Sequence, residues 1–143
     1  MKLDLSAFDA DKRYRSVVTL EGCQEMPRWN PSGGDSPPCS PQHAILMAEG
    51  FIRLRLAPNP TAAWELQRLE LRPLSIFETD APGFWFWLVI YHLVRRGHSS
   101  GVWPYFRLLV GMDGRLVEPV VTEEGSSWGR DERSWESYIQ SRA

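Results

Sequence analysis

The stretch that decides the fold is Phe84-Trp85-Phe86-Trp87-Leu88-Val89-Ile90-Tyr91-His92-Leu93-Val94, which is apolar almost throughout. It is too short to cross a bilayer as a helix, which takes about 20 residues. Its aromatic and β-branched side chains are typical of a β-strand. Alternate residues of a strand point to opposite faces of the sheet, and here both faces are apolar. We therefore expect a central strand with one face covered by a helix and the other by a second element, a subunit or a ligand.

A hairpin is expected beyond this strand, because Asp113-Gly114 lies between two strand-like runs. Asp-Gly suits a two-residue type I′ turn, in which glycine accepts a positive φ without strain. Such a turn would place Val110 opposite Val117. Because Pro119 cannot donate a hydrogen bond to a neighbouring strand, the second strand of the hairpin is expected at a sheet edge.

A long helix is expected over residues 41–56. Ser40 can cap its first turn, Pro41 suits the first helical position, and Pro58 would end it. Gly50 disfavours a helix, and the alternation of apolar residues over 51–56 also fits a strand. Whether the segment is helical throughout therefore stays open.

Two further strands are expected, over residues 14–20 and 64–71. Apolar parity in the second changes between Leu66 and Leu69, which predicts a β-bulge near Gln67-Arg68. The tail from Asp131 has the pattern of a short helix. The expected fold class is therefore α+β, with one long helix packed on an antiparallel β-meander and a short C-terminal helix. The order of elements is that of cystatin-like or cone-shaped sheets.

Composition restricts the class of protein. A chain of 143 residues with 43% hydrophobic side chains predicts a single globular domain over 1–143. Its net charge of −2 gives no general reason to bind nucleic acid. Only Lys2 and Lys12 among the basic residues are lysines, which is typical of a GC-rich, bacterial genome. The first residues lack the apolar core of an export signal, so we expect a cytoplasmic protein without a membrane anchor.

A Pro/Gly/Ser-rich loop is expected over residues 23–42, with five prolines and a Gly-Gly pair. Long segments without periodicity are usually functional, mobile or both. Cys23 and Cys39, at its two ends, are expected to be free thiols. Together with His43 they lack the paired spacing of a structural zinc site, so we expect no metal and no cofactor.

The candidates for a binding surface are large side chains near the expected loops, namely Arg28, Trp29, Trp103, Tyr105 and Trp128. Tryptophan, tyrosine and arginine are the usual hot-spot residues of protein interfaces. No serine, histidine or carboxylate lies in a recognisable catalytic motif. We therefore expect a small bacterial protein-binding domain without catalysis, of the immunity, inhibitor or adaptor kind. Its partner would be another protein, such as a toxin or effector.

The alternative is a cone-shaped α+β domain with an apolar pocket that binds or converts a small molecule. Tyr91, His92, Arg107 and Glu118 would then border the pocket. Arg107 and Glu118 would be diagonal neighbours across the hairpin and could form an ion pair. The second face of the central strand could be core, pocket or interface, and homodimerisation through it fits either hypothesis.

Overall fold

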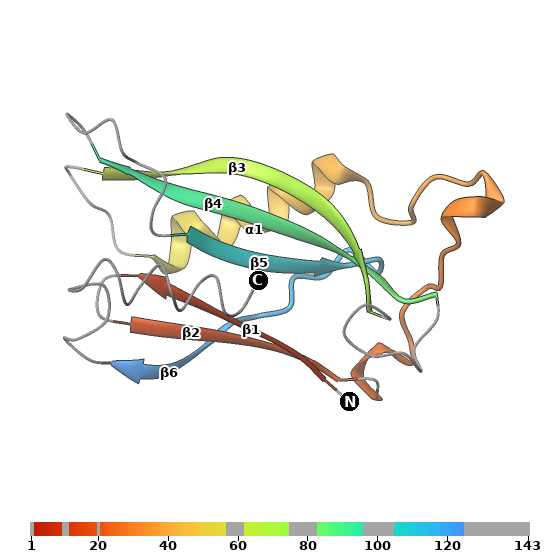
Figure 1. Ribbon diagram of the computed structural model, residues 1–143, viewed down its shortest axis with the longest axis horizontal. Coiled ribbons are helices and arrows are strands. Elements are labelled where there is room, and N and C mark those ends of the chain that lie inside the picture. Colours follow the sequence, from red (N-terminus) through yellow and green to blue (C-terminus); the bar gives the residue numbers. More distant parts are fainter. Residues whose placement is uncertain are drawn as a thin grey trace.

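The computed structural model describes residues 2–9, 12–19, 21–56, 62–74, 83–95 and 105–124. These residues form one α-helix packed against two three-stranded antiparallel sheets (Figure 1). The first sheet has the order β1-β2-β6, with β1 at Lys2–Asp9, β2 at Lys12–Thr19 and β6 at Val120–Glu124. The second has the order β3-β4-β5, with β3 at Ala62–Pro73, β4 at Trp85–Arg95 and β5 at Tyr105–Gly111. The expected α+β class is confirmed.

The expected meander corresponds to the β3-β4-β5 sheet alone. The first sheet was not predicted, because β1 was not recognised as a strand. Its partner β2 confirms the strand expected at 14–20, although it begins earlier. The helix expected from Asp131 lies outside the described residues.

β4 is the central strand of its sheet, as predicted, and pairs with β3 on one side and β5 on the other. Trp87, Val89 and Tyr91 point toward the helix and lie in one buried apolar cluster, which we call the helix-side cluster. Phe86, Leu88 and Ile90 point the other way, into a second cluster that also contains Leu5 of β1, Val18 of β2 and Leu109 of β5. The second face of β4 is therefore packed as core.

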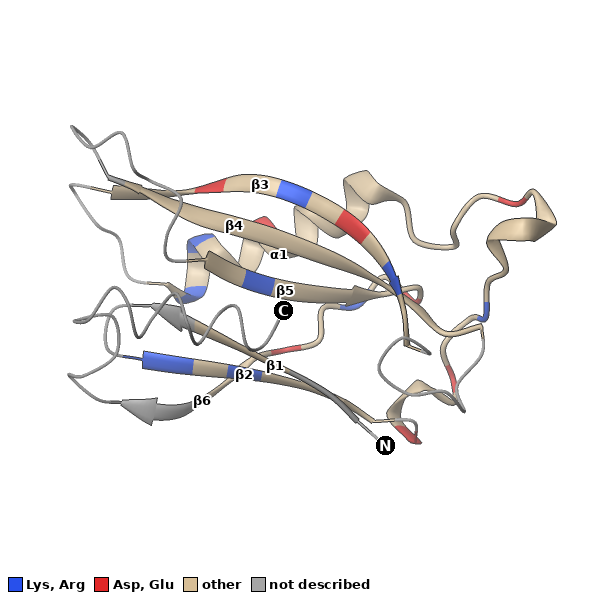
Figure 2. Ribbon diagram, in the orientation of Figure 1, with Lys and Arg blue, Asp and Glu red and all other residues tan. Residues whose placement is uncertain are grey.

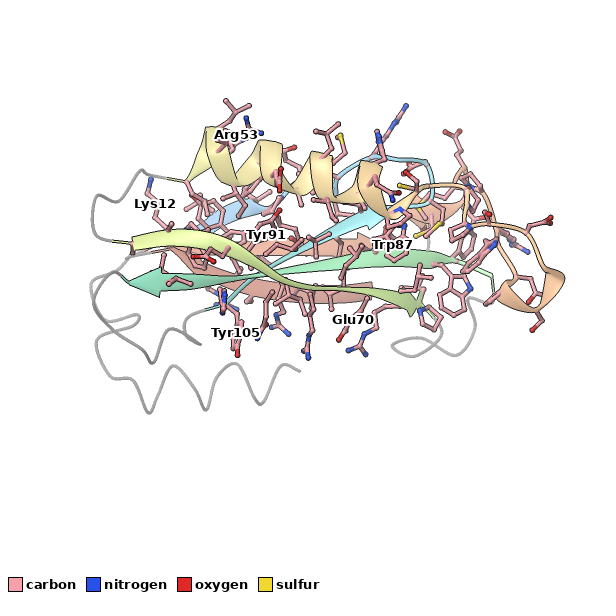
Figure 3. The ribbon with its side chains drawn as sticks, turned by 90° about the horizontal axis from the view of Figure 1, so that it is seen from above. Lys12, Arg53, Glu70, Trp87, Tyr91 and Tyr105 are labelled. Carbon is pink, nitrogen blue, oxygen red and sulfur yellow. The ribbon has the colours of Figure 1, made fainter. Side chains whose placement is uncertain are left out.

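The helix α1 spans Pro41–Arg55 and begins as predicted. Ser40 caps it, because its Oγ accepts a hydrogen bond of 3.1 Å from the backbone N of His43. Ala44, Ala48 and Phe51 form its buried face, and the small alanines allow α1 to pack closely on the second sheet. Figure 3 shows Trp87 and Tyr91 between α1 and β4, with Arg53 on the outer side of the helix.

The β-bulge predicted in β3 is confirmed, because the pairing of β3 with β4 shifts between Leu66 and Arg68. β3 is an edge strand, and charged side chains are spaced along its length (Figure 2). Glu70 forms ion pairs with Arg68 and Arg72, at N–O distances of 3.1 and 2.7 Å. Charges and a bulge are ordinary means of preventing an edge strand from pairing with another chain.

The hairpin turn differs from the expected two-residue turn. The backbone N of Gly114 donates to Gly111 O at 2.9 Å, and Gly111 N donates to Arg115 O at 3.0 Å. Met112, Asp113 and Gly114 therefore form a three-residue loop, in which Gly114 has φ 80°. An oxygen of the Asp113 carboxylate accepts a 3.0 Å bond from Arg115 N and closes this loop. The prediction of a two-residue turn was wrong.

The additional loop residue changes the register. Val110 pairs with Leu116 rather than with Val117. A shift of one residue exchanges the two faces of a strand. Leu116 accordingly packs against the helix-side cluster and Val117 against the second cluster. The chain then leaves β5, and β6 pairs with β2 at the edge of the first sheet.

No helix of the described segments is long and apolar enough to span a membrane.

Candidate functional site

The loop between β2 and α1 projects beyond the ends of the strands (Figure 1). It contains two short 3-10 helices, η1 at Glu21–Cys23 and η2 at Pro31–Gly33. All residues from Asn30 to Ser36 are exposed, and we call this segment the loop tip. An exposed segment of this kind is where binding residues commonly lie.

The base of the loop is fixed to the beginning of β4. The backbone N of Trp29 donates a 2.9 Å hydrogen bond to Gly83 O. The Trp29 ring meets the Trp85 ring edge-on, with 5.4 Å between centroids. The guanidinium carbon of Arg28 lies 5.0 Å from the centre of the Phe84 ring. Trp29 is half-buried and packs on Trp85 of β4, whereas Arg28 is exposed and covers the Phe84 ring just before that strand.

The loop tip is held by its own hydrogen bonds. Asn30 caps η2, because its Oδ1 accepts a 3.0 Å bond from Ser32 N. Gly34 follows in the left-handed region with φ 81°. The indole Nε1 of Trp29 then donates to Asp35 O at 2.9 Å. These contacts connect the two ends of the tip to each other.

The far end of the loop is tied to the core. The indole Nε1 of Trp87 donates a buried 2.8 Å hydrogen bond to Cys39 O. Ser40 then caps α1, and the Nε2 of His43 lies 2.9 Å from Gly114 O in the hairpin turn. The loop is therefore attached to β4 at both ends, through Trp85 and through Trp87.

Tyr105, the one further candidate for the binding surface among the described residues, does not join this loop. Tyr105 begins β5 and pairs with His92, far along β4 from Trp85. It lies on the face opposite α1 (Figure 3), where its hydroxyl accepts a 3.5 Å bond from Gln67 Nε2. Trp103 and Trp128 lie outside the described residues. Among the candidates that the structure describes, it brings together Arg28 and Trp29.

The four residues of the alternative pocket are divided among three places. Tyr91 faces α1, and His92 and Arg107 are on the opposite face of the sheet. Glu118 is exposed and forms an ion pair with Arg55, at 2.7 Å between Oε1 and Nη1. Glu118 therefore pairs with Arg55 and not, as expected, with Arg107. The altered hairpin register places Glu118 on the opposite face of its segment from the one expected. These residues do not border a common pocket.

Tyr91 and Arg107 are both buried in the fold. Among the described residues nothing forms a hydrogen bond with the buried Tyr91 hydroxyl. Burial, and after it the charge of Glu49, raises the pKa of Tyr91 well above its ordinary value. Arg107 is buried between the two sheets, where its Nη2 donates to Ser6 O at 3.4 Å. Arg107 thereby connects β5 to β1, which lies beside it.

A cavity of about 240 Å³ lies between the end of β2, η1 and the hairpin turn. We call it the hairpin cavity. Its apolar lining includes Val18, Cys23, Met26, Phe86, Leu116 and Val117, and its charged lining comes from Asp113 and Arg115. Sequence reasoning did not find it, because its walls come from segments far apart in the chain. The only local signal was the Asp-Gly turn.

The two cysteines are free and buried. Burial, and after it the charge of Asp113, raises the pKa of both thiols, so neither has the low pKa of a reactive cysteine. Within the described segments no group of three or more His, Cys, Asp or Glu side chains is placed to hold a metal ion.

Comparison of the chain with known protein families, with curated proteins and with solved structures finds no match.

Proposed function

We propose that this protein is a protein-binding domain without catalysis of its own, and that it binds its partner through the loop tip, Asn30 to Ser36. The observation that carries the proposal is an exposed segment whose two ends are both fixed to β4. Trp29 anchors one end on Trp85, and Cys39 anchors the other on Trp87.

A fixed loop is suited to binding because it loses little conformational entropy when a partner immobilises it. Prolines 27, 31, 37 and 38 restrict the backbone further. The tip itself carries asparagine, serine, glycine and aspartate, which offer adaptable hydrogen bonds at binding surfaces. Arg28 and Trp29 then act mainly as the support of the binding segment.

The partner in this proposal is another protein, and the domain is of the immunity, inhibitor or adaptor kind in a bacterial cytoplasm. The cystatin-like or cone-shaped arrangement suggested by the order of elements is compatible with that role. Fold analogy does not fix function, since such folds host enzymes and ligand binders too. The loop geometry is therefore the stronger support.

Two glycine substitutions test the proposal. A Cβ at Gly33, in the loop tip, would have no atom within 4 Å, and its φ is not positive. Gly33→Arg should therefore leave the fold intact while placing a large side chain on the binding segment. Gly50→Arg is the matched control, because a Cβ at Gly50 in α1 is equally free of contacts. Arginine also favours a helix over glycine by about 1 kcal/mol.

The measurement has two stages. Proteins retained by the immobilised wild-type domain are identified in extracts of the source cells, and the strongest is purified for titration calorimetry. We expect Gly33→Arg to weaken its affinity at least tenfold, a loss of about 1.4 kcal/mol, and Gly50→Arg to leave it unchanged. Equal affinity of both variants would show that binding does not involve the loop tip.

A further inference from the structure

The hairpin cavity combines an apolar interior with a mouth that carries both signs of charge. Met26, Phe86 and Val117 line the interior, and the buried thiol of Cys23 lies in the same wall. Sulfur atoms and aromatic rings make favourable contacts with apolar groups of many shapes. Polar groups at the edge of an apolar cavity fix the orientation of a small ligand.

Asp113 and Arg115 are the two charged residues of the lining. Both are exposed. One carboxylate oxygen of Asp113 accepts the bond from Arg115 N that closes the turn, which fixes the position of the carboxylate. The second oxygen accepts no hydrogen bond within the described residues, and the Arg115 guanidinium makes no ion pair there. The mouth thus presents one acceptor for a cation and one donor group for an anion.

The size of the cavity limits the ligand. Sites for drug-sized ligands measure about 300–1,000 Å³, and the hairpin cavity, at about 240 Å³, is smaller than these. It therefore suits a ligand smaller than a drug, of the size of a single amino acid.

We propose that the hairpin cavity binds a free apolar α-amino acid of the leucine or methionine type. Its side chain lies in the apolar interior, its ammonium group contacts Asp113, and its carboxylate contacts Arg115. An apolar α-amino acid carries adjacent charges of both signs beside one apolar chain, which matches this arrangement. This binding is separate from the loop tip, and neither proposal depends on the other.

Titration calorimetry with three related ligands tests each charge. L-Leucine has both charged groups, leucinamide lacks the carboxylate, and 4-methylpentanoate lacks the ammonium group. We expect L-leucine to bind with a Kd of about 1 mM or lower, and each of the other two at least tenfold more weakly. Absence of saturable binding by L-leucine and L-methionine, or equal affinity for all three ligands, would overturn the proposal.

Two variants assign the contacts. Arg115→Gln should weaken the binding of L-leucine at least tenfold. It should leave the binding of leucinamide unchanged, because leucinamide has no carboxylate to contact Arg115. Asp113→Asn keeps an oxygen that can accept from Arg115 N, so the turn is preserved. This variant should weaken the binding of L-leucine but not that of 4-methylpentanoate, which has no ammonium group. Arg53→Gln, on the outer side of α1 (Figure 3), is the control and should bind L-leucine as the wild type does.

A second measurement, the rate of cysteine alkylation, uses the wild-type protein. Because Cys23 lines the cavity and Cys39 does not, bound L-leucine should slow alkylation of Cys23 at least severalfold and leave the rate for Cys39 unchanged. Peptide mass spectrometry separates the two sites. Equal rates for Cys23 with and without L-leucine, or unchanged L-leucine affinity in both Arg115→Gln and Asp113→Asn, would show that the ligand does not occupy this cavity.

Discussion

At the scale of single residues, Tyr91 carries one of the two buried side-chain polar atoms that lack a hydrogen-bond partner among the described residues. Its hydroxyl is buried beneath α1 and has no hydrogen-bond partner among the described residues. A buried polar group without a partner costs about 1–3 kcal/mol. The ring itself packs in the helix-side cluster, so only the oxygen is unfavourable.

Tyr91→Phe should therefore raise the free energy of unfolding at neutral pH by about 1 kcal/mol. Urea denaturation monitored by tryptophan fluorescence measures this change. A less stable variant would show that the hydroxyl does have a partner in the folded protein.

The same substitution has a consequence at alkaline pH. Burial raises the pKa of Tyr91 in the folded state above its ordinary value of 10.0. Below that pH both states keep the proton, whereas above it the unfolded chain loses the proton first, so stability falls as pH rises. Between about pH 9 and pH 11 the wild type should lose more stability than Tyr91→Phe. Parallel curves for the two proteins would contradict a raised pKa.

At the scale of elements, the predictions that succeeded depended on local chemistry. Ser40 and Pro41 specify the start of α1 whatever the rest of the chain does. The change of apolar parity in β3 reveals the bulge because each face of a strand must match its surroundings. The predicted length of the hairpin turn was wrong, because turns of two and of three residues both accept Asp-Gly. The three-residue turn is closed by the hydrogen bond from Arg115 N to the Asp113 carboxylate, which the sequence pattern does not reveal.

The turn makes a prediction of its own. Gly114 has a positive φ, and a Cβ there would lie 3.0 Å from Nε2 of His43. Gly114→Ala should therefore destabilise the protein by about 1 kcal/mol or more. Gly33→Ala is the control with the same chemical change, and it should alter stability by less than about 0.5 kcal/mol. Equal effects in chemical denaturation would argue against the left-handed conformation of Gly114.

At the scale of the whole molecule, the sequence predicted the class of the fold but not how its parts meet. The second face of β4 is covered by Leu5 and Val18 from a sheet that begins with the unpredicted strand β1. The hairpin cavity exists only because β2, η1 and the turn after β5 come together. Such long-range contacts leave no periodic signal in the sequence. Trp29 was expected at the binding surface, and its ring packs edge-on against Trp85 at the base of the loop.

Whether the loop tip is held in one conformation is the question on which the proposed function depends. Backbone ¹⁵N relaxation of the isolated domain answers it without a known partner. We expect order parameters of about 0.85 for Asn30, Ser32 and Gly33, as in the strands, and a clear decrease in Trp29→Ala, which removes the support. Order parameters below about 0.6 at these positions in the wild type would contradict the account of a preformed binding loop.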